Sequence, residues 1–275
     1  MSSLFWILSS FLAFGVLIVI YWTLAFVRQR RQLFPAHKVQ RLSIVDGSEG
    51  EAFETVWLSH DWGKTEAHLL SAPSESERPL PAAIVLHGQL GIIDSWHERM
   101  KGLTNRGVHC LLVEYPGYGD SEGDCHEATL TDVVTAAYDF LEKKTEVNAD
   151  AIIGVGRSMG GGVISQLIGR RELSTLILMS TFTSVKPFFK RKGIPGWLVR
   201  DPLDTLSKLK QAKFPTLVFH GYQDDVIPVS HARALASANP NCQLVLEQGD
   251  HDSVPNDWDA FWQLVVEFHR KSARE

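Results

Sequence analysis

Apolar and polar positions divide the chain into one long uncharged stretch and a following region of short alternating runs. The uncharged stretch covers 24 residues, from Leu4 to Val27. At about 1.5 Å per residue, a helix of this length crosses a hydrocarbon core of about 30 Å. Trp6, Tyr21 and Trp22 suit the interfaces of a bilayer, and three arginines follow within residues 28–31. The pattern predicts a single membrane-spanning helix.

The charges around this stretch favour an uncleaved anchor and indicate its orientation. A cleaved signal peptide has its basic residues first and an apolar core of about 7 to 15 residues, whereas here the core is longer and the cations follow it. A helix buried in a domain normally keeps a polar stripe, which this stretch lacks. Because positive charge follows the span, we expect the next domain on the cytoplasmic side, close to lipid headgroups. The predicted organisation is an anchor with its basic flank at 1–31, a linker at 32–50 and a globular domain at 51–275.

Beyond the linker, short continuous apolar runs alternate with longer amphipathic segments. Two edge strands are predicted at Glu54–His60 and Thr65–Ala72. Continuous apolar runs are typical of parallel strands buried on both faces, and they occur at Ala82–Leu86, Val108–Tyr115, Ala151–Val155, Thr175–Met179, Thr216–Phe219 and Gln243–Leu246. Helical patterns fall at Asp94–Asn105, Leu130–Lys144, Met159–Arg170, Ser230–Ala238 and Trp258–Lys271. This alternation predicts an α/β fold with a mostly parallel sheet, helices on both faces, and functional residues at the carboxyl ends of the strands.

One segment interrupts the alternation. Residues 181–211 lie between two predicted strands and carry several large apolar side chains, including Phe188, Phe189 and Trp197. We interpret this segment as a short lid. Its aromatic residues could line an acyl pocket or face a membrane, and a plain connecting helix with its own core contacts is an equal alternative.

Composition places the domain among ordinary globular proteins and excludes some functions. Residues 1–41 hold five cations and no carboxylate, so the remainder carries 22 cations against 32 anions. Such an acidic domain repels phosphate backbones, and we expect no nucleic-acid partner. The three cysteines are widely spaced, without a CxxC pair, which argues against a disulfide framework or a structural zinc site: Cys110, Cys125 and Cys242. Nothing in the sequence indicates an oligomeric state.

A candidate nucleophile follows the predicted strand Ala151–Val155. The residues there read Gly156-Arg157-Ser158-Met159-Gly160, and a helical pattern comes next. In a strand-to-helix turn of the form G-x-S-x-G, a strained backbone exposes the serine hydroxyl, and the glycines remove Cβ atoms that would clash. The pattern alone is weak, but its position between a strand and a helix favours Ser158 as a nucleophile.

A serine hydroxyl needs a base to take its proton and a carboxylate to orient that base. With this kind of turn, the order along the chain is serine, acid, histidine. Asp224 and Asp225 come just after the strand Thr216–Phe219, and either could supply the acid. His251 lies in the loop that follows the next strand, at the same edge of the sheet, and is the predicted base.

Other titratable residues near these loops are weaker candidates. His231 and His269 fall on helical stretches, where a solvated surface position is expected. His87 precedes Ser158, which violates the chain order, so we expect a structural role for it. Asp250 and Asp252 flank His251 in sequence and are predicted to form the turn.

A tetrahedral intermediate also needs hydrogen-bond donors aimed at its oxyanion, each contributing roughly 3 to 4 kcal/mol. The backbone N–H of Met159, directly after the serine, is one expected donor. The second is expected from the loop after the strand Ala82–Leu86, with the N–H of Gln89 as the best candidate.

These motifs together resemble the α/β-hydrolase superfamily over about residues 50–270. The resemblance rests on His87-Gly88-Gln89-Leu90-Gly91, on the loop from Glu114 to Gly123, on Gly156 to Gly160, on His220 to Asp224 and on the loop around His251. It is greatest to the branch of short-lidded, amino-terminally anchored serine hydrolases that contains protein depalmitoylases and serine-aminopeptidase-like domains. In that branch the acid is the fifth residue of an HGxxD pattern, which implies Asp224 rather than Asp225. One position differs: Gln89 stands where relatives often have Asn. Tyr115–Gly123 is similar to the family's Y-x-G-Y-G-x-S-E-G loop, in which Pro116 occupies a position that is expected to vary. The resemblance implies no metal and no organic cofactor.

The sequence as a whole predicts two-step acyl transfer by Ser158, His251 and Asp224 on an ester or thioester, with a lipidated or membrane-partitioned substrate expected first. Pocket shape, which the triad does not fix, decides the acyl group. Peptidase or perhydrolase action with the same residues are alternatives. A non-catalytic scaffold tethered to the membrane is a rival of a different class, and the complete set of nucleophile, base and acid argues against it.

Overall fold

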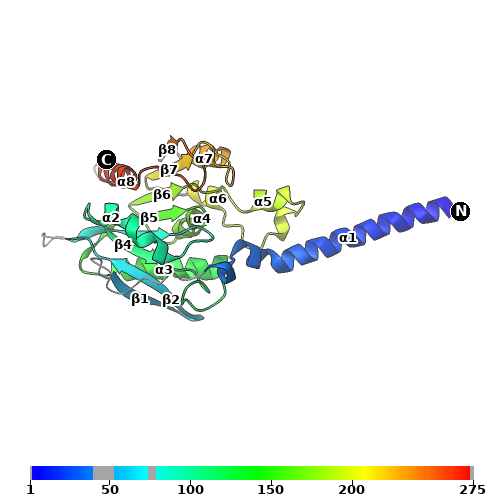
Figure 1. Cartoon of the computed structure of the whole chain (residues 1–275), viewed down its shortest axis with the longest axis horizontal. Coiled ribbons are helices and arrows are strands. Elements are labelled where there is room, and N and C mark those ends of the chain that lie inside the picture. Colours follow the sequence, from blue (N-terminus) through cyan, green and yellow to red (C-terminus); the bar gives the residue numbers. More distant parts are fainter. Residues whose placement is uncertain (1, 40–52, 74–78, 273–275) are drawn as a thin grey trace.

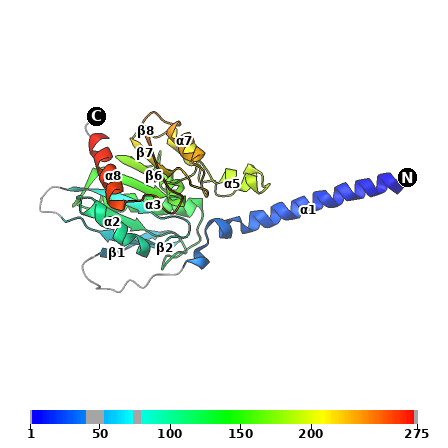
Figure 2. The ribbon, with the colours of Figure 1, turned by 45° about the horizontal axis from the view of Figure 1, so that its top comes forward.

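The predicted strands form one sheet, from which an N-terminal helix projects (Figures 1 and 2). This computed structural model describes residues 2–39, 53–73 and 79–272. Within those residues the sheet has eight strands, in the order β1-β2-β4-β3-β5-β6-β7-β8. Their bounds are β1 (Phe53–His60), β2 (Gly63–Leu70), β3 (Leu80–Leu86), β4 (His109–Val113), β5 (Val147–Arg157), β6 (Thr175–Met179), β7 (Thr216–Gly221) and β8 (Cys242–Glu247). β2 is antiparallel to both of its neighbours, and all other pairs are parallel.

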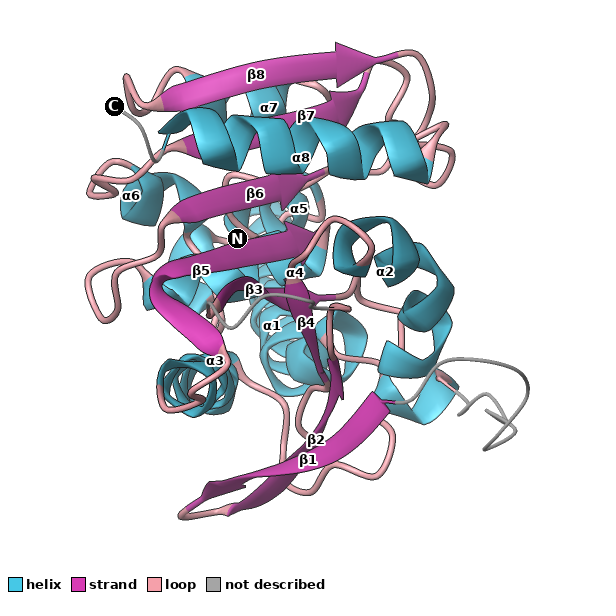
Figure 3. Ribbon diagram, turned by 90° about the vertical axis from the view of Figure 1, so that its left-hand side faces the viewer, coloured by secondary structure: helices cyan, strands magenta, loops and turns pink. Residues whose placement is uncertain are grey.

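Helices cover both faces of the sheet (Figure 3). α2 (His97–Thr104) and α8 (Trp258–Ser272) pack against each other on one face, where Met100 and Trp262 are fully buried. α3 (Glu127–Glu142), α4 (Met159–Ile164) and α7 (Ser230–Ala236) belong to the core on the other face. Each central strand therefore has apolar neighbours on both sides, which explains its continuous apolar run. The predicted fold class is confirmed.

Helix boundaries differ from the prediction where side chains or glycines act locally. α3 begins three residues before the predicted Leu130, because the His126 side chain accepts a hydrogen bond from the Thr129 N–H and the Thr129 hydroxyl accepts one from the His126 N–H. The helix predicted over Met159–Arg170 is shorter and passes into a 3₁₀ turn (Ser165–Leu167). Its first turn contains three successive glycines, which have low helix propensity.

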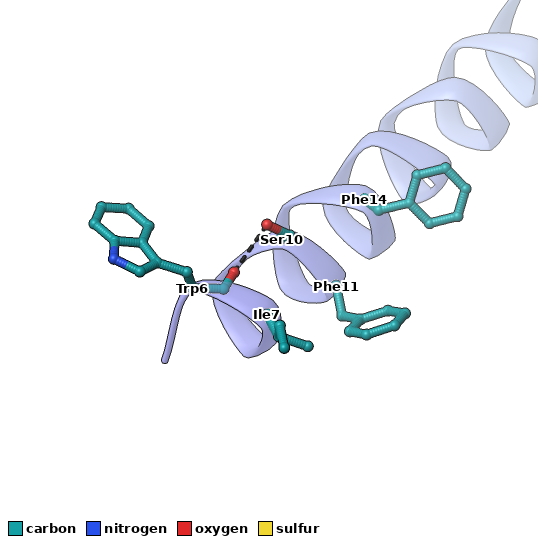
Figure 4. A pocket seen from close by; sticks show the side chains of 5 residues that line it. All are labelled: Trp6, Ile7, Ser10, Phe11 and Phe14. Carbon is teal, nitrogen blue, oxygen red and sulfur yellow. Dashed lines mark hydrogen bonds between the residues drawn. The ribbon is translucent and has the colours of Figure 1, made fainter. Parts of the chain in front are cut away.

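The N-terminal helix α1 (Ser2–Leu33) leaves the domain along most of its length (Figures 1 and 2). Its segment Phe5–Leu33 is long and apolar enough to cross a membrane, with a mean hydropathy of 2.3 in its most apolar part, which has no buried residue. Figure 4 shows Phe11 and Phe14 extending from this part of the helix, and the two residues are 71% and 63% exposed. The Ser10 hydroxyl donates to the Trp6 carbonyl, so this polar group is satisfied within the helix.

The end of α1 packs on the globular domain. The helix continues two residues past the predicted boundary at 31, and Phe34, which directly follows it, is a core residue with 5% exposure. A 3₁₀ turn (Ala36–Lys38) comes next. The first part of the predicted linker is thus ordered structure, and residues 40–50 of that linker lie outside the described residues.

The predicted lid contains two short helices and a 3₁₀ turn between β6 and β7. They are α5 (Lys186–Arg191), the 3₁₀ turn (Gly196–Leu198) and α6 (Thr205–Leu209). Phe189 and Ile194 are buried against the main core, whereas Trp197 is 76% exposed. α5 lies at the side of the domain that faces α1 in both ribbon views (Figures 1 and 2).

A buried pair of histidines should make the stability of the fold depend on pH. His97 Nε2 lies 2.8 Å from His68 Nδ1, and His68 Nε2 lies 3.0 Å from Glu66 Oε1. Burial, with a smaller effect from His68, lowers the pKa of His97 from 6.5 to about 4. Between these two values the unfolded chain takes up a proton that the folded chain excludes, so stability falls as the pH drops through this window.

We expect the melting temperature to fall between pH 7 and pH 5, and to fall less in His97→Gln, which removes the titrating group. Thermal unfolding of both proteins in detergent at the two pH values measures this difference. Equal losses in the two proteins would contradict the assignment to His97.

Candidate active site

The predicted nucleophile lies in a strained turn at the carboxyl end of β5. Ser158 has φ 53° and ψ −116°, a left-handed region that a non-glycine residue rarely adopts. Its N–H donates to the Met179 carbonyl on β6 at 2.8 Å, and its own carbonyl accepts from the Thr181 hydroxyl at 2.6 Å. These two bonds hold the turn between β5 and α4. The strain is therefore supported by the neighbouring strand and the loop that follows it.

The flanking glycines allow the backbone segments of this turn to approach closely. A Cβ atom on Gly156 would lie 2.3 Å from the Gly160 carbonyl oxygen, and one on Gly160 would lie 2.3 Å from the Leu86 carbonyl oxygen. Real Cβ atoms do not approach backbone so closely, and neither segment can move without shifting a central strand. Only glycine fits at both positions.

The three predicted site residues form one hydrogen-bonded chain. His251 Nε2 lies 3.1 Å from Ser158 Oγ, and His251 Nδ1 lies 2.8 Å from Asp224 Oδ2. The geometry suits an imidazole that donates from Nδ1 to the carboxylate and accepts the serine proton at Nε2. Ser158, Asp224 and His251 come from the ends of β5, β7 and β8, so three parallel strands bring them to one edge of the sheet.

Asp224 is buried, whereas the alternative acid, Asp225, is exposed. Asp224 Oδ1 accepts from the N–H groups of Val226 and Ile227, at 3.0 and 2.7 Å. These donors replace part of the water that a buried carboxylate loses. The resemblance to known hydrolases also pointed to Asp224, and the structure gives the same residue the contact with His251.

His220 is a supporting residue that the sequence interpretation did not assign. Its Nε2 donates to the Ile227 carbonyl at 2.7 Å and lies 3.3 Å from Asp224 Oδ2. Burial lowers the pKa of His220, and the Ile227 and Asp224 oxygens offset this only in part. A neutral His220 fixes the turn that carries Asp224. Its place as the first residue of the His220–Asp224 pattern was the available signal.

The loop after β3 is held by several side chains. His87 Nε2 lies 2.6 Å from Glu114 Oε1, and the Tyr115 hydroxyl donates to the His87 carbonyl at 2.6 Å. The Tyr118 hydroxyl donates to the Gln89 carbonyl at 3.0 Å. His87 thus contacts Glu114 and lies outside the chain of Ser158, His251 and Asp224, in agreement with the structural role expected for it.

Residues 83–261, more than half of the chain, match the alpha/beta hydrolase family. The chain belongs to this family. The alpha/beta hydrolase domain-containing protein WAV2 of Arabidopsis thaliana is 28% identical over 249 residues, which cover 81% of this chain and 80% of the relative. The alpha/beta hydrolase domain-containing protein aho-3 of Caenorhabditis elegans is 34% identical over 172 residues, covering 59% and 50%. The superfamily predicted from the motifs is confirmed.

Solved structures confirm the fold of this alpha/beta hydrolase. Est1E from Butyrivibrio proteoclasticus has a TM-score of 0.65 and 20% identity, covering 80% of this chain and 99% of its own. The acylaminoacyl peptidase of Pyrococcus horikoshii has a TM-score of 0.66 and 13% identity, covering 82% of this chain and 42% of its own. At these identities the likeness concerns the fold alone.

Two histidines of this alpha/beta hydrolase are buried, contrary to the prediction of solvated positions. His231 is 7% exposed; its Nδ1 accepts from the Thr183 N–H at 3.1 Å and its ring stacks on Phe188. His269 is 6% exposed and bonds the Thr175 hydroxyl at 2.9 Å. Burial lowers the pKa of both histidines, which keeps them neutral packing residues.

The loop that carries His251 is held from both sides. Arg157 Nη2 donates to the His251 carbonyl at 2.6 Å and to Asp252 Oδ1 at 3.0 Å. Asp250 Oδ1 accepts from the N–H groups of Asp252 and Ser253, as a turn-forming aspartate does. Arg157, at the first x of the G-x-S-x-G motif, was not predicted to have a role.

Two cavities meet at Ser158. One, of about 300 Å³, is lined mainly by apolar side chains of the lid, together with Gln89, Met159 and the end of α1. The other, of about 540 Å³, has a more polar wall that includes Arg99, Arg157 and His251. The two residues expected to supply oxyanion donors, Gln89 and Met159, thus line the cavity that contains Ser158. Within the described residues, no group of three or more His, Cys, Asp or Glu is arranged to hold a metal ion.

The close approach at the serine turn predicts which glycine can be replaced. Gly156→Ala should lower the free energy of unfolding by about 3 kcal/mol, because its Cβ overlaps backbone that cannot move away. Gly88→Ala, at the same edge of the sheet, is the matched control, since its Cβ would lie 3.5 Å from the nearest atoms, an ordinary contact. Thermal and denaturant unfolding of the two variants measure the difference. Equal stability of Gly156→Ala and Gly88→Ala would show that the turn has room for a Cβ atom at residue 156.

Proposed function

We propose that this alpha/beta hydrolase cleaves carboxylic esters or thioesters through an acyl-enzyme on Ser158. The observation that carries the proposal is the hydrogen-bonded chain from Asp224 through His251 to a strained serine that opens onto two cavities. Strain of this kind persists only where the surrounding structure supports it, and it is found at functional sites.

The geometry suits acyl transfer in two steps. Ser158 Oγ attacks the carbonyl carbon while His251 Nε2 takes the hydroxyl proton, and Asp224 stabilises the resulting imidazolium. The Gln89 and Met159 N–H groups are the proposed donors to the oxyanion. His251 then gives the proton to the leaving group. In the second step His251 activates a water molecule, which releases the acid and restores the serine.

The two cavities suit different parts of the substrate. The apolar cavity, with Phe182, Val185 and Phe189 in its wall, suits an acyl chain. The cavity with Arg99 and Arg157 suits a polar leaving group.

Several solved structures with this fold are described as esterases, among them the Pyrococcus furiosus esterase Pf2001. Serine peptidase action is a second candidate, favoured by the acylaminoacyl peptidase that shares the fold. Perhydrolase action would use the same residues with peroxide in place of water.

We further propose that α1 anchors the enzyme in a membrane, with the catalytic domain on the cytoplasmic side. The Tyr21 hydroxyl donates to the Lys192 carbonyl at 2.5 Å, and Trp22 Nε1 donates to the Gly193 carbonyl at 3.0 Å. Residues 2–20 precede these lid contacts and form a helix about 28 Å long, close to the thickness of a hydrocarbon core of about 30 Å. Exposed Trp197 packs on Trp22 and suits the bilayer interface. A lid at the bilayer surface favours lipid-like or lipidated substrates.

Labelling with a fluorophosphonate probe tests the nucleophile. The wild-type protein in detergent should be labelled, and Ser158→Ala should not.

Asp224→Asn should lower kcat on a short-chain ester by about 10⁴-fold, as loss of the orienting carboxylate does in such triads. Asp225→Asn is the matched control, because Asp225 is exposed, and it should retain wild-type kcat. A folded wild-type protein that is neither labelled nor active would favour the tethered scaffold.

Extraction and protease treatment test the anchor. The full chain should stay in the membrane pellet after washing with alkaline carbonate. Protease added to intact cells should leave the domain whole, because the domain is expected on the cytoplasmic side, and permeabilised cells should lose it. Release by carbonate would contradict the anchor. Cleavage in intact cells would contradict only the orientation.

A further inference from the structure

The last turn of α1 is part of the wall of the apolar cavity. Gln32 and Leu33 line that cavity together with Ser158, Met159 and the lid. Leu33 is half-buried and packs against the main core. The end of α1 and the nucleophile therefore line the same cavity, which a helix that served only as a tether would not need to do.

The contacts that hold this turn in place are specific and partly buried. Gln29 is 3% exposed, and its side chain donates to the Leu198 carbonyl at 3.0 Å and accepts from the Arg200 N–H at 2.8 Å. Arg30 forms a two-pronged ion pair with Asp201, which is buried. Two-pronged arginine–carboxylate bonds fix orientation as well as distance. These contacts position the end of α1 against the lid.

Gln89 joins the same turn to the loop after β3. Its side-chain amide Nε2 donates to the Gln32 and Leu33 carbonyls, both at 2.8 Å. The last carbonyls of a helix lack partners within the helix, and here one side chain satisfies two of them. The backbone of the same residue is held from the other side by the Tyr118 hydroxyl. Gln89 is therefore fixed between the end of α1 and the Tyr118 turn.

We propose that the end of α1 is a working part of the active site: Leu33 is a wall that limits which acyl chains fit, and Gln89 is a positioning residue that links this wall to the oxyanion loop. The inference rests on the proposed function. The helix whose first part would cross the membrane thus ends in the wall that sets acyl-chain specificity.

A chain-length profile tests the wall. kcat/KM is measured on acetyl, butyryl and octanoyl p-nitrophenyl esters with the full chain in detergent micelles. Leu33→Trp should lower kcat/KM on the octanoyl ester by about tenfold or more, as the loss of space for a few methylenes does, and leave the acetyl ester within about twofold. Leu33→Ala should shift the preference toward the longer chain. Val27→Trp is the matched control, since Val27 lies on the same helix, is 66% exposed and should keep the wild-type profile.

A second variant tests the link. Gln89→Leu keeps the backbone N–H and a similar volume but removes both donors to α1. We expect kcat on the acetyl ester to fall about tenfold with KM unchanged, because a displaced oxyanion donor weakens transition-state binding. Labelling of Ser158 in each variant shows that the site has folded.

The outcomes separate the inference from the function on which it rests. A wild-type protein without labelling or hydrolysis would overturn both. An active enzyme in which both Leu33 variants keep the wild-type chain-length profile would overturn the wall. Unchanged kcat in Gln89→Leu would overturn the positioning role.

Discussion

The close approach of backbone segments at Ser158 is the constraint on which the rest of the site depends. Gly160 lies so near the Leu86 carbonyl that no Cβ fits between them, and Leu86 is the last residue of β3. This one contact sets the end of β3, and hence the start of the loop with Gln89, relative to the start of α4. The nucleophile and both proposed oxyanion donors are therefore positioned by the same two central strands. A change in the packing of β3 on β5 would disturb all three groups together.

Buried polar groups around the site are bonded to the backbone of the loops that carry it. Asp224, His220 and the turn at Ile227 bond one another, and His87, Glu114 and Tyr115 do the same on the other side of the serine. Such networks stabilise most when every member is satisfied, and of the residues named here His220 has one nitrogen, Nδ1, that is buried without a hydrogen-bond partner. Each network converts a surface loop into a rigid support, which catalytic geometry requires. The loops at the strand ends thus hold their side chains in place without regular secondary structure.

Much of the fold followed from local patterns, and the differences follow from contacts between distant segments. The parallel strands were predictable because burial on both faces leaves continuous apolar runs. The position after the strand did not by itself distinguish Asp224 from Asp225, since both follow β7 and only the turn decides which side chain is buried; the resemblance to the HGxxD pattern was needed to select Asp224. His231 and His269 were wrongly expected at the surface. A helical pattern does not show that Phe188 of the lid or Thr175 of β6 will cover a histidine.

The contacts of the N-terminal helix with the lid could likewise not be predicted from its local pattern. Up to Ile20 it carries no charge and its only polar side chains are four serines, so no charged or strongly polar face directs its packing. From Tyr21 onward, Tyr21, Trp22 and Gln29 donate to backbone carbonyls of the lid. Gln29 also accepts from a backbone N–H of the lid, and Arg30 pairs with a lid aspartate. The change from lipid-compatible to protein-compatible chemistry thus occurs within one continuous helix. Because a helix is stiff along its axis, the lid and the apolar cavity keep a fixed position relative to the apolar segment. If that segment lies in a bilayer, the depth of the acyl cavity relative to the lipid is set by the number of residues between Tyr21 and Leu33.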